Sequence, residues 1–245
     1  MTAASGEGKV WPGLSADTRV SPYQCALRAF RAYSAVASQF ECSGSRVRRV
    51  CERRCTLRAI ALTALAFLVP GPFDQITGGY LFGRRVVEGL RALGRTVTVA
   101  ELAGRYPDAD DAARAAVTAT LGSLPTGSAA VIDGLALPGC VDCLKSEAQR
   151  LRLVGFIHHP LSLETGLSPA EVRHYAALEA RLWPLLRGIL CPSAHTARAV
   201  IASGVAAHRV VVTMPGTAKP ESRGGRAGQG PLRLLAVGTR TPRKR

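Results

Sequence analysis

The sequence predicts an α/β protein in which a Rossmann-like parallel sheet carries helices on both faces. First, apolar segments of strand length alternate with longer helical segments from residue 59 onward, which is typical of a parallel sheet with crossover helices. Second, strands such as residues 61–69 are apolar along nearly their whole length, which indicates burial on both faces. Third, Ser168 is followed by Pro169 and Glu171, the pattern of a capping box at a helix start.

The expected strands and helices follow one another along the chain. Strands are expected at residues 61–69, 96–102, 129–135, 153–157, 188–191 and 209–213. Helices are expected at residues 80–93, 110–121, 143–151, 169–186 and 193–204. Boundary residues support these limits, since Gly94 ends the first helix, Pro184 bends or ends the fourth, and Ser193 caps the fifth.

Local composition supports the individual elements. In the first helix, Leu81, Val86 and Leu90 lie on or near one face. The second strand is rich in β-branched residues, which favour extended structure. The second helix is rich in alanine and opens with acidic residues, where the helix dipole favours them.

The two ends of the chain differ from the central domain, residues 59–216. Residues 1–58 are basic and show no sustained period, so we expect a poorly ordered extension. Residues 217–231 are rich in Gly, Arg and Pro and are expected to form a linker. Residues 232–245 are predicted to form an apolar strand and a basic loop. Because a lone strand cannot bury both faces, we expect this piece to open a second domain that is truncated.

Most of the formal net charge of +15 lies at the two ends. Residues 1–58 carry +6 and residues 219–245 carry +7, whereas the 160 residues between them carry only +2. A nearly neutral folded body argues against a specific nucleic-acid partner. Basic ends could hold the protein weakly at an anionic membrane, so peripheral association with the inner membrane face stays open.

The cysteine content indicates a reducing, cytoplasmic setting. Seven cysteines is an odd number, and their spacings fit no small disulfide scaffold in a chain of 245 residues. The Arg-rich run at 46–58, followed by apolar residues 59–69, resembles a signal peptide, but it begins late and is too short to span a bilayer. We expect a buried first strand there instead.

Two strand ends carry the residues that we expect to form a site. The first strand leads through a turn to Gly78 and Gly79, whose backbone can approach a phosphate closely at the start of a helix. The strand at 153–157 ends in His158 and His159. If the strand continues through these residues, alternation turns the two rings to opposite faces, so only one should face the cleft, and we expect it to be His158. Carboxyl ends of parallel strands form the ligand sites of open α/β sheets.

Four motifs carry a resemblance to a known enzyme family. They are P-G-P-F-D-Q-I-T-G-G-Y at 70–80, F-I-H-H-P-L-S-L-E-T-G at 156–166, I-L-C-P-S-A-H-T at 189–196 and L-L-A-V-G-T-R-T-P-R-K at 234–244. In this order they resemble the two-domain glycosyltransferases of the GT-B fold, specifically the retaining group called family four. The resemblance implies two Rossmann-like domains facing a cleft, of which the first mainly holds the acceptor and the second the nucleotide sugar.

The same resemblance implies transfer of a sugar from a nucleotide-sugar donor to a carbohydrate or lipid-linked acceptor, with retention and without a metal or cofactor. His158 matches the family's histidine near the transferred sugar, with His159 beside it. Imidazole can hydrogen-bond a sugar hydroxyl and help stabilise developing charge. Glu164 and Thr165 could shape the acceptor loop or serve simple turn chemistry.

Donor contacts are implied in both domains. Gly78 and Gly79 match the paired glycines of the family's first loop. Lys244 matches the lysine that contacts the donor diphosphate, with Arg243 as a cationic neighbour. Because the second domain is expected to be truncated, donor binding by this chain is expected to be impaired.

Three further motifs carry less weight. Asp108 and Asp110 form a D-x-D sequence, but they precede a helix, where acidic caps are common. Cys140 and Cys143 form a C-x-x-C without the second pair that a zinc site needs. Residues 77–83 do not match G-x-G-x-x-G, which disfavours a nicotinamide-dependent oxidoreductase.

A second functional hypothesis is a non-catalytic Rossmann-type binding module whose basic ends associate with an acidic partner. Such a module would bind polyanions with steep salt dependence and would not respond to nucleotide sugars. The glycosyltransferase hypothesis requires the glycine pair and His158 to lie at the rim of one crevice.

Overall fold

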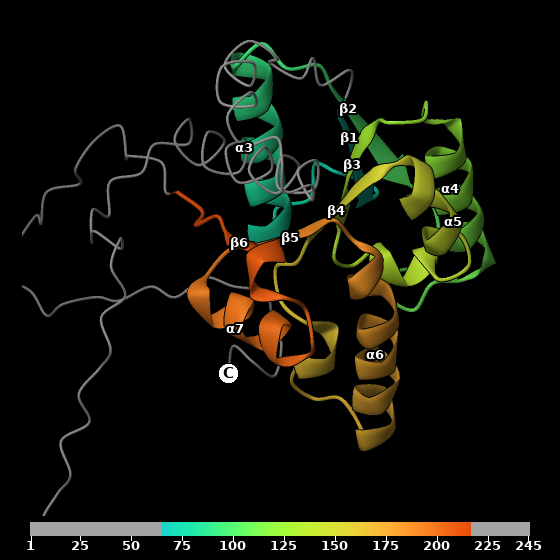
Figure 1. Cartoon of the computed structure of the whole chain (residues 1–245), viewed down its shortest axis with the longest axis vertical. Coiled ribbons are helices and arrows are strands. Elements are labelled where there is room, and N and C mark those ends of the chain that lie inside the picture. The colour runs from blue at the N-terminus through green and yellow to red at the C-terminus, as the bar shows by residue number, and fades with distance from the viewer. Residues whose placement is uncertain (1–64, 217–245) are drawn as a thin grey trace, which may run out of the picture.

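Six parallel strands form one sheet in the residues that this computed structural model describes, 65–216 (Figure 1). The strands are β1 (Leu65–Pro70), β2 (Val97–Leu102), β3 (Ala129–Asp133), β4 (Arg152–Phe156), β5 (Gly188–Cys191) and β6 (Val210–Val212). Their order across the sheet is β2-β1-β3-β4-β5-β6, and each neighbouring pair is parallel. The predicted α/β class with a Rossmann-like parallel sheet is confirmed.

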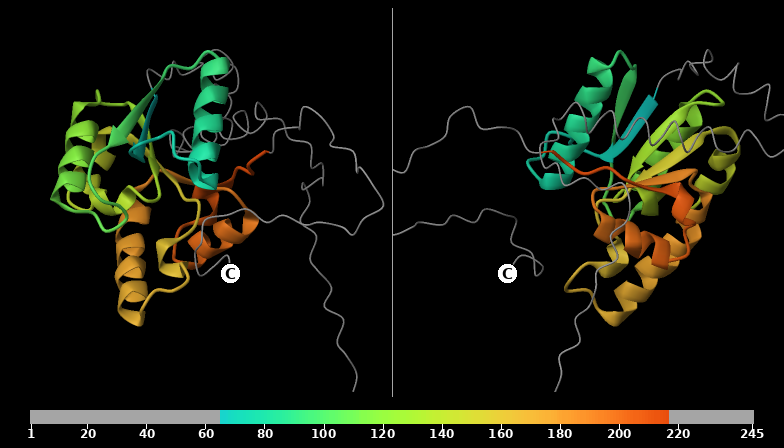
Figure 2. Two further views of the ribbon diagram at one scale, coloured as in Figure 1. Left: turned by 180° about the vertical axis from the view of Figure 1, so that it is seen from behind. Right: turned by 60° about the vertical axis from the view of Figure 1, so that its left-hand side comes forward.

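Helices connect these strands and cover both faces of the sheet. Within residues 65–216 the α-helices are α3 (Gly78–Ala92), α4 (Asp111–Ser123), α5 (Leu144–Arg150), α6 (Pro169–Leu182) and α7 (Ala194–Ala202). Short 3-10 turns are η1 (Leu137–Cys140), η2 (Leu161–Leu163), η3 (Trp183–Leu185) and η4 (Ala207–Arg209). Figure 2 shows α3 on one side of the strands and α4 with α5 on the other.

Side chains that alternate along each strand build two separate cores. On β1, Phe67 and Val69 join the core beneath α3, whereas Ala66 and Leu68 join the core on the opposite face. That second core includes side chains from α4, α5, η3 and α7. Burial of a Leu, Val or Phe side chain contributes about 1.5–3 kcal/mol, so both faces stabilise the sheet and fix its register.

The strand order creates a switch point between β1 and β3. The chain passes from β1 outward to β2 and then returns to place β3 on the other side of β1. In open α/β sheets, the loops that leave the carboxyl ends of the strands diverge at such a point and leave a crevice for a ligand. The residues that follow β1, β3 and β4 therefore define the candidate site.

The sequence predicted that the glycine pair would precede the helix at 80–93. In the structure both glycines lie within α3. The reason is Thr77, which is the N-cap of the helix and accepts a hydrogen bond from Tyr80 N through its hydroxyl oxygen. Gly78 and Gly79 are therefore the first two residues of the helix. Their position at the helix start is kept, but with helical backbone.

Two other boundaries come earlier than predicted. β3 ends at Asp133, because the side chain of Asp133 accepts a hydrogen bond from the backbone of Leu135 and turns the chain. α6 ends at Leu182, because Pro184 has no N–H to continue the helical hydrogen bonds. The start of α6 is as predicted, with a complete capping box between Ser168 and its N3 glutamate.

Several predicted segments lie outside the described residues. These are the basic extension at 1–58, the linker at 217–231 and the strand with its basic loop at 232–245. The first four residues of the predicted strand at 61–69 also lie outside them.

Gly104, between β2 and α4, is predicted to tolerate no side chain. Its φ is +97°, and a Cβ atom there would lie 2.3 Å from the backbone nitrogen of Ala113. Gly104→Ala should therefore lower the free energy of unfolding by roughly 3 kcal/mol or more. The control is Gly122→Ala in α4, where a Cβ would meet nothing within 4 Å, and which should raise that free energy by about 0.5–1 kcal/mol. Urea unfolding followed by circular dichroism measures both, and equal stabilities would contradict the argument.

Candidate functional site

The N-terminus of α3 lies at the carboxyl end of β1 and presents backbone donors. Its first intrahelical hydrogen bond runs from Leu81 N to Thr77 O (2.9 Å), so the N–H groups of Gly78 and Gly79 precede the hydrogen-bonded ladder. The first turn contains no acidic residue, so no carboxylate of that turn neutralises the positive end of the helix dipole. A Cβ atom at Gly78 would meet nothing within 4 Å, so there is open space beside this residue.

Side-chain hydrogen bonds hold the loop between β1 and α3. The buried hydroxyl of Tyr80 donates to Pro70 O (2.9 Å), and Arg84 Nη1 donates to Phe73 O (2.6 Å). From the neighbouring strand β2, Glu101 Oε2 accepts a hydrogen bond from Phe73 N (2.9 Å). The start of α3 is therefore anchored to both β1 and β2.

His158 follows β4 by two residues, and its ring packs against α3. The ring centroid lies 4.4 Å from that of Phe156 and 6.1 Å from that of Phe82. A Cβ atom at Gly79 would lie 3.5 Å from His158 Cδ2, so the imidazole occupies the space beside the second glycine. The His158 side chain is 24% exposed, which leaves part of the ring open to a ligand. The structure thus brings Gly79 and His158 together from two separate sequence motifs.

Asp133, the last residue of β3, belongs to the same cluster and was missed by the sequence analysis. Its Oδ2 lies 3.1 Å from His158 Nε2, and its Oδ1 accepts a hydrogen bond from Leu135 N (2.9 Å). The Asp133 side chain is only 8% exposed. Burial, and secondly the charge of Asp133, raise the pKa of the nearby Tyr80 hydroxyl. The available signal was an acidic residue that ends an apolar strand, one strand before the histidine pair.

His159 lies in different surroundings from His158. Its Nε2 donates to Leu163 O (3.1 Å), and its ring lines a small pocket together with Trp183 and Glu179. One ring of the pair therefore packs beside α3 and the other beside α6 and η3, although β4 ends before both residues and strand alternation does not extend to them.

Glu179 of α6 is a buried carboxylate that holds the loop after β4. Its Oε1 accepts a hydrogen bond from Leu161 N (2.6 Å), and its Oε2 accepts one from Ser162 Oγ (2.5 Å). Burial raises the pKa of Glu179, while the hydrogen bonds from Ser162 and Leu161 oppose the rise. Nothing in the local sequence distinguishes this glutamate from the other charged residues of α6, so the sequence analysis missed it.

The predicted acceptor-loop residues lie further along the same loop. Glu164 follows η2, and its Oε1 accepts a hydrogen bond from Thr165 N (3.2 Å). This local bond is turn chemistry. Thr165 is exposed on this loop.

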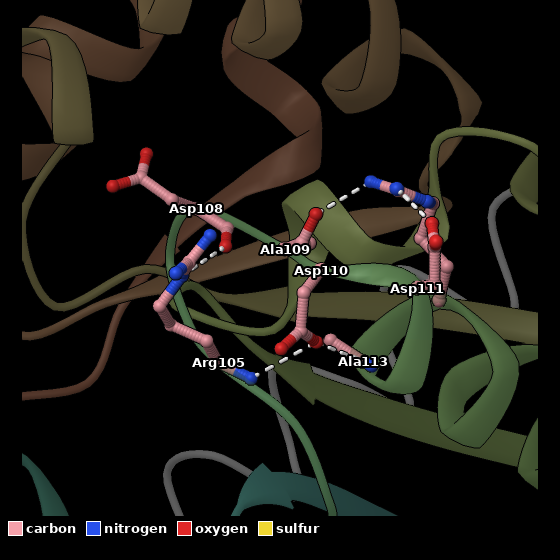
Figure 3. Close-up of polar contacts among 7 residues, drawn as sticks. Arg105, Asp108, Ala109, Asp110, Asp111 and Ala113 are labelled. Carbon is pink, nitrogen blue, oxygen red and sulfur yellow. Dashed lines mark hydrogen bonds and ion pairs between the residues drawn. The ribbon is translucent and has the colours of Figure 1, made fainter.

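The D-x-D sequence supports the start of α4 (Figure 3). Asp110 is the N-cap, and its Oδ1 accepts hydrogen bonds from Ala113 N (2.9 Å) and Arg105 N (3.2 Å), which lower the pKa of Asp110. Asp108 accepts a hydrogen bond from the hydroxyl of Tyr175 (2.6 Å). Figure 3 shows the carboxylates of Asp108 and Asp110 turned away from each other. The predicted role of Asp110 as a cap is confirmed.

Cys140 and Cys143 are buried residues of the core opposite α3. Both are free thiols, and burial raises the pKa of each. The Cys140 thiol donates to Ala136 O (3.8 Å). Across residues 65–216, no three His, Cys, Asp or Glu side chains are grouped so that they could hold a metal ion.

Two predicted donor contacts, Arg243 and Lys244, lie outside the described residues. The helices between residues 65 and 216 include none with both the length and the apolar character required to cross a bilayer.

The fold and the site define a Rossmann-like domain with a polar cluster at its switch point. No model of a known protein family matches the chain, and a comparison with curated proteins also gives no match. The functional assignment therefore depends on the cluster of Gly78, Gly79, Asp133 and His158.

The burial of Glu179 predicts a pH-dependent contribution to stability. Because its pKa is raised in the folded state above the ordinary value of 4.5, this contribution is fully present below about pH 4.5 and is lost as pH rises through the raised pKa. Glu179→Gln removes the titration. The free energy of unfolding of the wild type should therefore fall relative to that of Glu179→Gln between about pH 4 and neutrality, as measured by urea unfolding across this range.

Glu171→Gln provides a control of opposite sign. The hydrogen bonds from Ser168 lower the pKa of Glu171, so its contribution is present above the ordinary pKa and is lost as pH falls. The wild type should therefore gain stability relative to Glu171→Gln as pH rises. The same direction of change against both variants would refute the assignment.

Proposed function

We propose that residues 65–216 are the acceptor-side domain of a retaining glycosyltransferase of the GT-B type. The enzyme would transfer a sugar from a nucleotide sugar to a carbohydrate or lipid-linked acceptor without a metal. The observation that carries the proposal is the proximity of Gly79 to the histidine, since a Cβ at Gly79 would lie 3.5 Å from the ring of His158. The family resemblance implies that the motifs at 70–80 and 156–166 act in the same reaction. Gly79 of the first motif and His158 of the second lie side by side at the switch point.

The cluster suits the charges that develop during glycosyl transfer. Positive charge builds at the anomeric carbon, and negative charge builds on the departing phosphate. The start of α3 suits the phosphate, because Gly78 and Gly79 offer backbone donors and the positive end of the helix dipole without obstructing side chains. The imidazole of His158 suits a sugar hydroxyl, and the carboxylate of Asp133 adds negative charge close to it.

Nucleotide-sugar binding tests the proposal at the start of α3. Titration of the 245-residue chain with UDP-glucose, GDP-mannose or ADP-glucose at millimolar concentrations, at which NMR detects even impaired binding, should shift the amides of Gly78 and Gly79 and the ring of His158. Gly78→Glu should weaken binding about tenfold or more, because a carboxylate in the open space beside the first residue of α3 repels the diphosphate.

The matched control is Gly122→Glu, which adds the same charge at a helical glycine that also has open space around it. This variant should bind like the wild type. Equal affinities of the two variants, or no shifts at the three residues with any of the nucleotide sugars, would contradict the proposal. Salt-sensitive binding of polyanions without a response to nucleotide sugars would favour the non-catalytic binding module.

Substitution of the adjacent histidines separates their roles. In an assay of sugar transfer, His158→Ala should lower kcat roughly 100-fold or more and leave the circular dichroism spectrum unchanged. His159→Ala should retain most of the activity, because His159 lines the pocket beside α6 rather than the cluster at Gly79. Unchanged turnover by His158→Ala, or equal losses from the two substitutions, would remove His158 from the mechanism.

A further inference from the structure

The hydrogen bonds of Asp133 determine where the proton of His158 resides. A carboxylate accepts hydrogen bonds and donates none. Oδ1 of Asp133 accepts from Leu135 N, and Oδ2 lies 3.1 Å from His158 Nε2. Nε2 must therefore carry the hydrogen of this pair, and in the neutral ring the other nitrogen, Nδ1, is then an acceptor.

The rest of the His158 environment keeps the ring in this orientation. Phe156 and Phe82 contact it edge to face, and Gly79 lies against Cδ2 and Nε2. Asp133 is itself tied to the turn after β3 and is nearly inaccessible to solvent. No hydrogen bond among residues 65–216 involves His158 Nδ1, and the side chain is partly exposed. One ring nitrogen is therefore held by the protein, and the other is left for a ligand.

We propose that Asp133 is a positioning residue that keeps His158 in the tautomer with the proton on Nε2 and so makes Nδ1 a hydrogen-bond acceptor. The inference rests on the proposed function, in which His158 meets a hydroxyl group, and it specifies that the hydroxyl donates. When the imidazole is neutral, it and the carboxylate of Asp133 together carry one negative charge, which disfavours a phosphate at this point. The diphosphate is then expected at Gly78, and the hydroxyl at His158.

Nitrogen-15 NMR of the imidazole tests the tautomer without any ligand. At alkaline pH, where histidine side chains are neutral, long-range ¹H–¹⁵N spectra of the whole chain should show the His158 proton on Nε2. In Asp133→Asn, the amide oxygen should stay with the backbone donor of Leu135, which places the NH₂ group opposite Nε2. Because this group donates, the His158 proton should move to Nδ1. Asp142→Asn, at an exposed position on another loop, should leave the tautomer unchanged.

A wild-type proton on Nδ1, an equal mixture of tautomers, or a folded Asp133→Asn protein with an unchanged tautomer would overturn the positioning role. If Asp133→Asn does not fold, the wild-type spectrum alone decides between these outcomes. Because no ligand is present, the result does not depend on whether the protein transfers sugars.

Ligand titrations then test what Nδ1 accepts. UDP-glucose or GDP-mannose should shift the His158 Nδ1 resonance in the direction of a hydrogen-bonded nitrogen. UDP or GDP alone should shift the amides of Gly78 and Gly79 and leave Nδ1 unchanged. Two results would overturn the assignment of a sugar hydroxyl as the donor to Nδ1. The Nδ1 resonance could respond equally to nucleotide sugars and to free nucleoside diphosphates, or it could stay fixed while the amides of Gly78 and Gly79 respond to the nucleotide sugar. Amides that respond to none of the compounds contradict the proposed function instead, and the tautomer result stands by itself.

Discussion

The parallel pairing of β3 with β1 and β4 is the constraint on which the candidate site depends. Its register sets Ile132 beside Leu68 and Asp133 beside Phe156, so the three strands end at a similar level. Their loops then bring a helix N-terminus, a carboxylate and an imidazole into one space from distant parts of the chain. A slip of β3 by one residue would turn Asp133 to the opposite face of the sheet and separate it from the ring.

Most of the fold could be predicted because its signals are local. Continuous apolar strands, the capping serine Ser168 and the helix breakers Gly94 and Pro184 each act through residues a few positions away. The boundaries that were predicted less well depend on side-chain hydrogen bonds. The hydrogen bond from Tyr80 N to the Thr77 side chain starts α3 two residues earlier than predicted, and the hydrogen bond from Leu135 N to Asp133 ends β3 two residues earlier. Such side-chain hydrogen bonds compete with the backbone hydrogen bonds of helices and strands, and the pattern of apolar residues does not reveal them.

The site could be predicted only in part. Gly79 and His158 stand in motifs at strand ends, and strand topology alone places such motifs near one edge of a sheet. Asp133 and Glu179 act on partners 25 and 18 residues away, respectively. In the sequence, the first is an acidic strand end and the second is one of several charges on a helix. Tertiary pairing decides which acidic side chain is buried against an imidazole or a loop.

The carboxylate of Glu179 also joins α6 mechanically to the loop after β4. Its hydrogen bonds reach the backbone and side chain of residues 161–162, and the carbonyl of Leu163 in turn holds His159. Because both oxygens of Glu179 accept hydrogen bonds from this loop, a tilt of α6 is expected to displace the loop with it. Figure 1 shows α6 extending away from the sheet. A displacement of α6 would therefore be expected to reach the loop after β4 and His159 without passing through the strands.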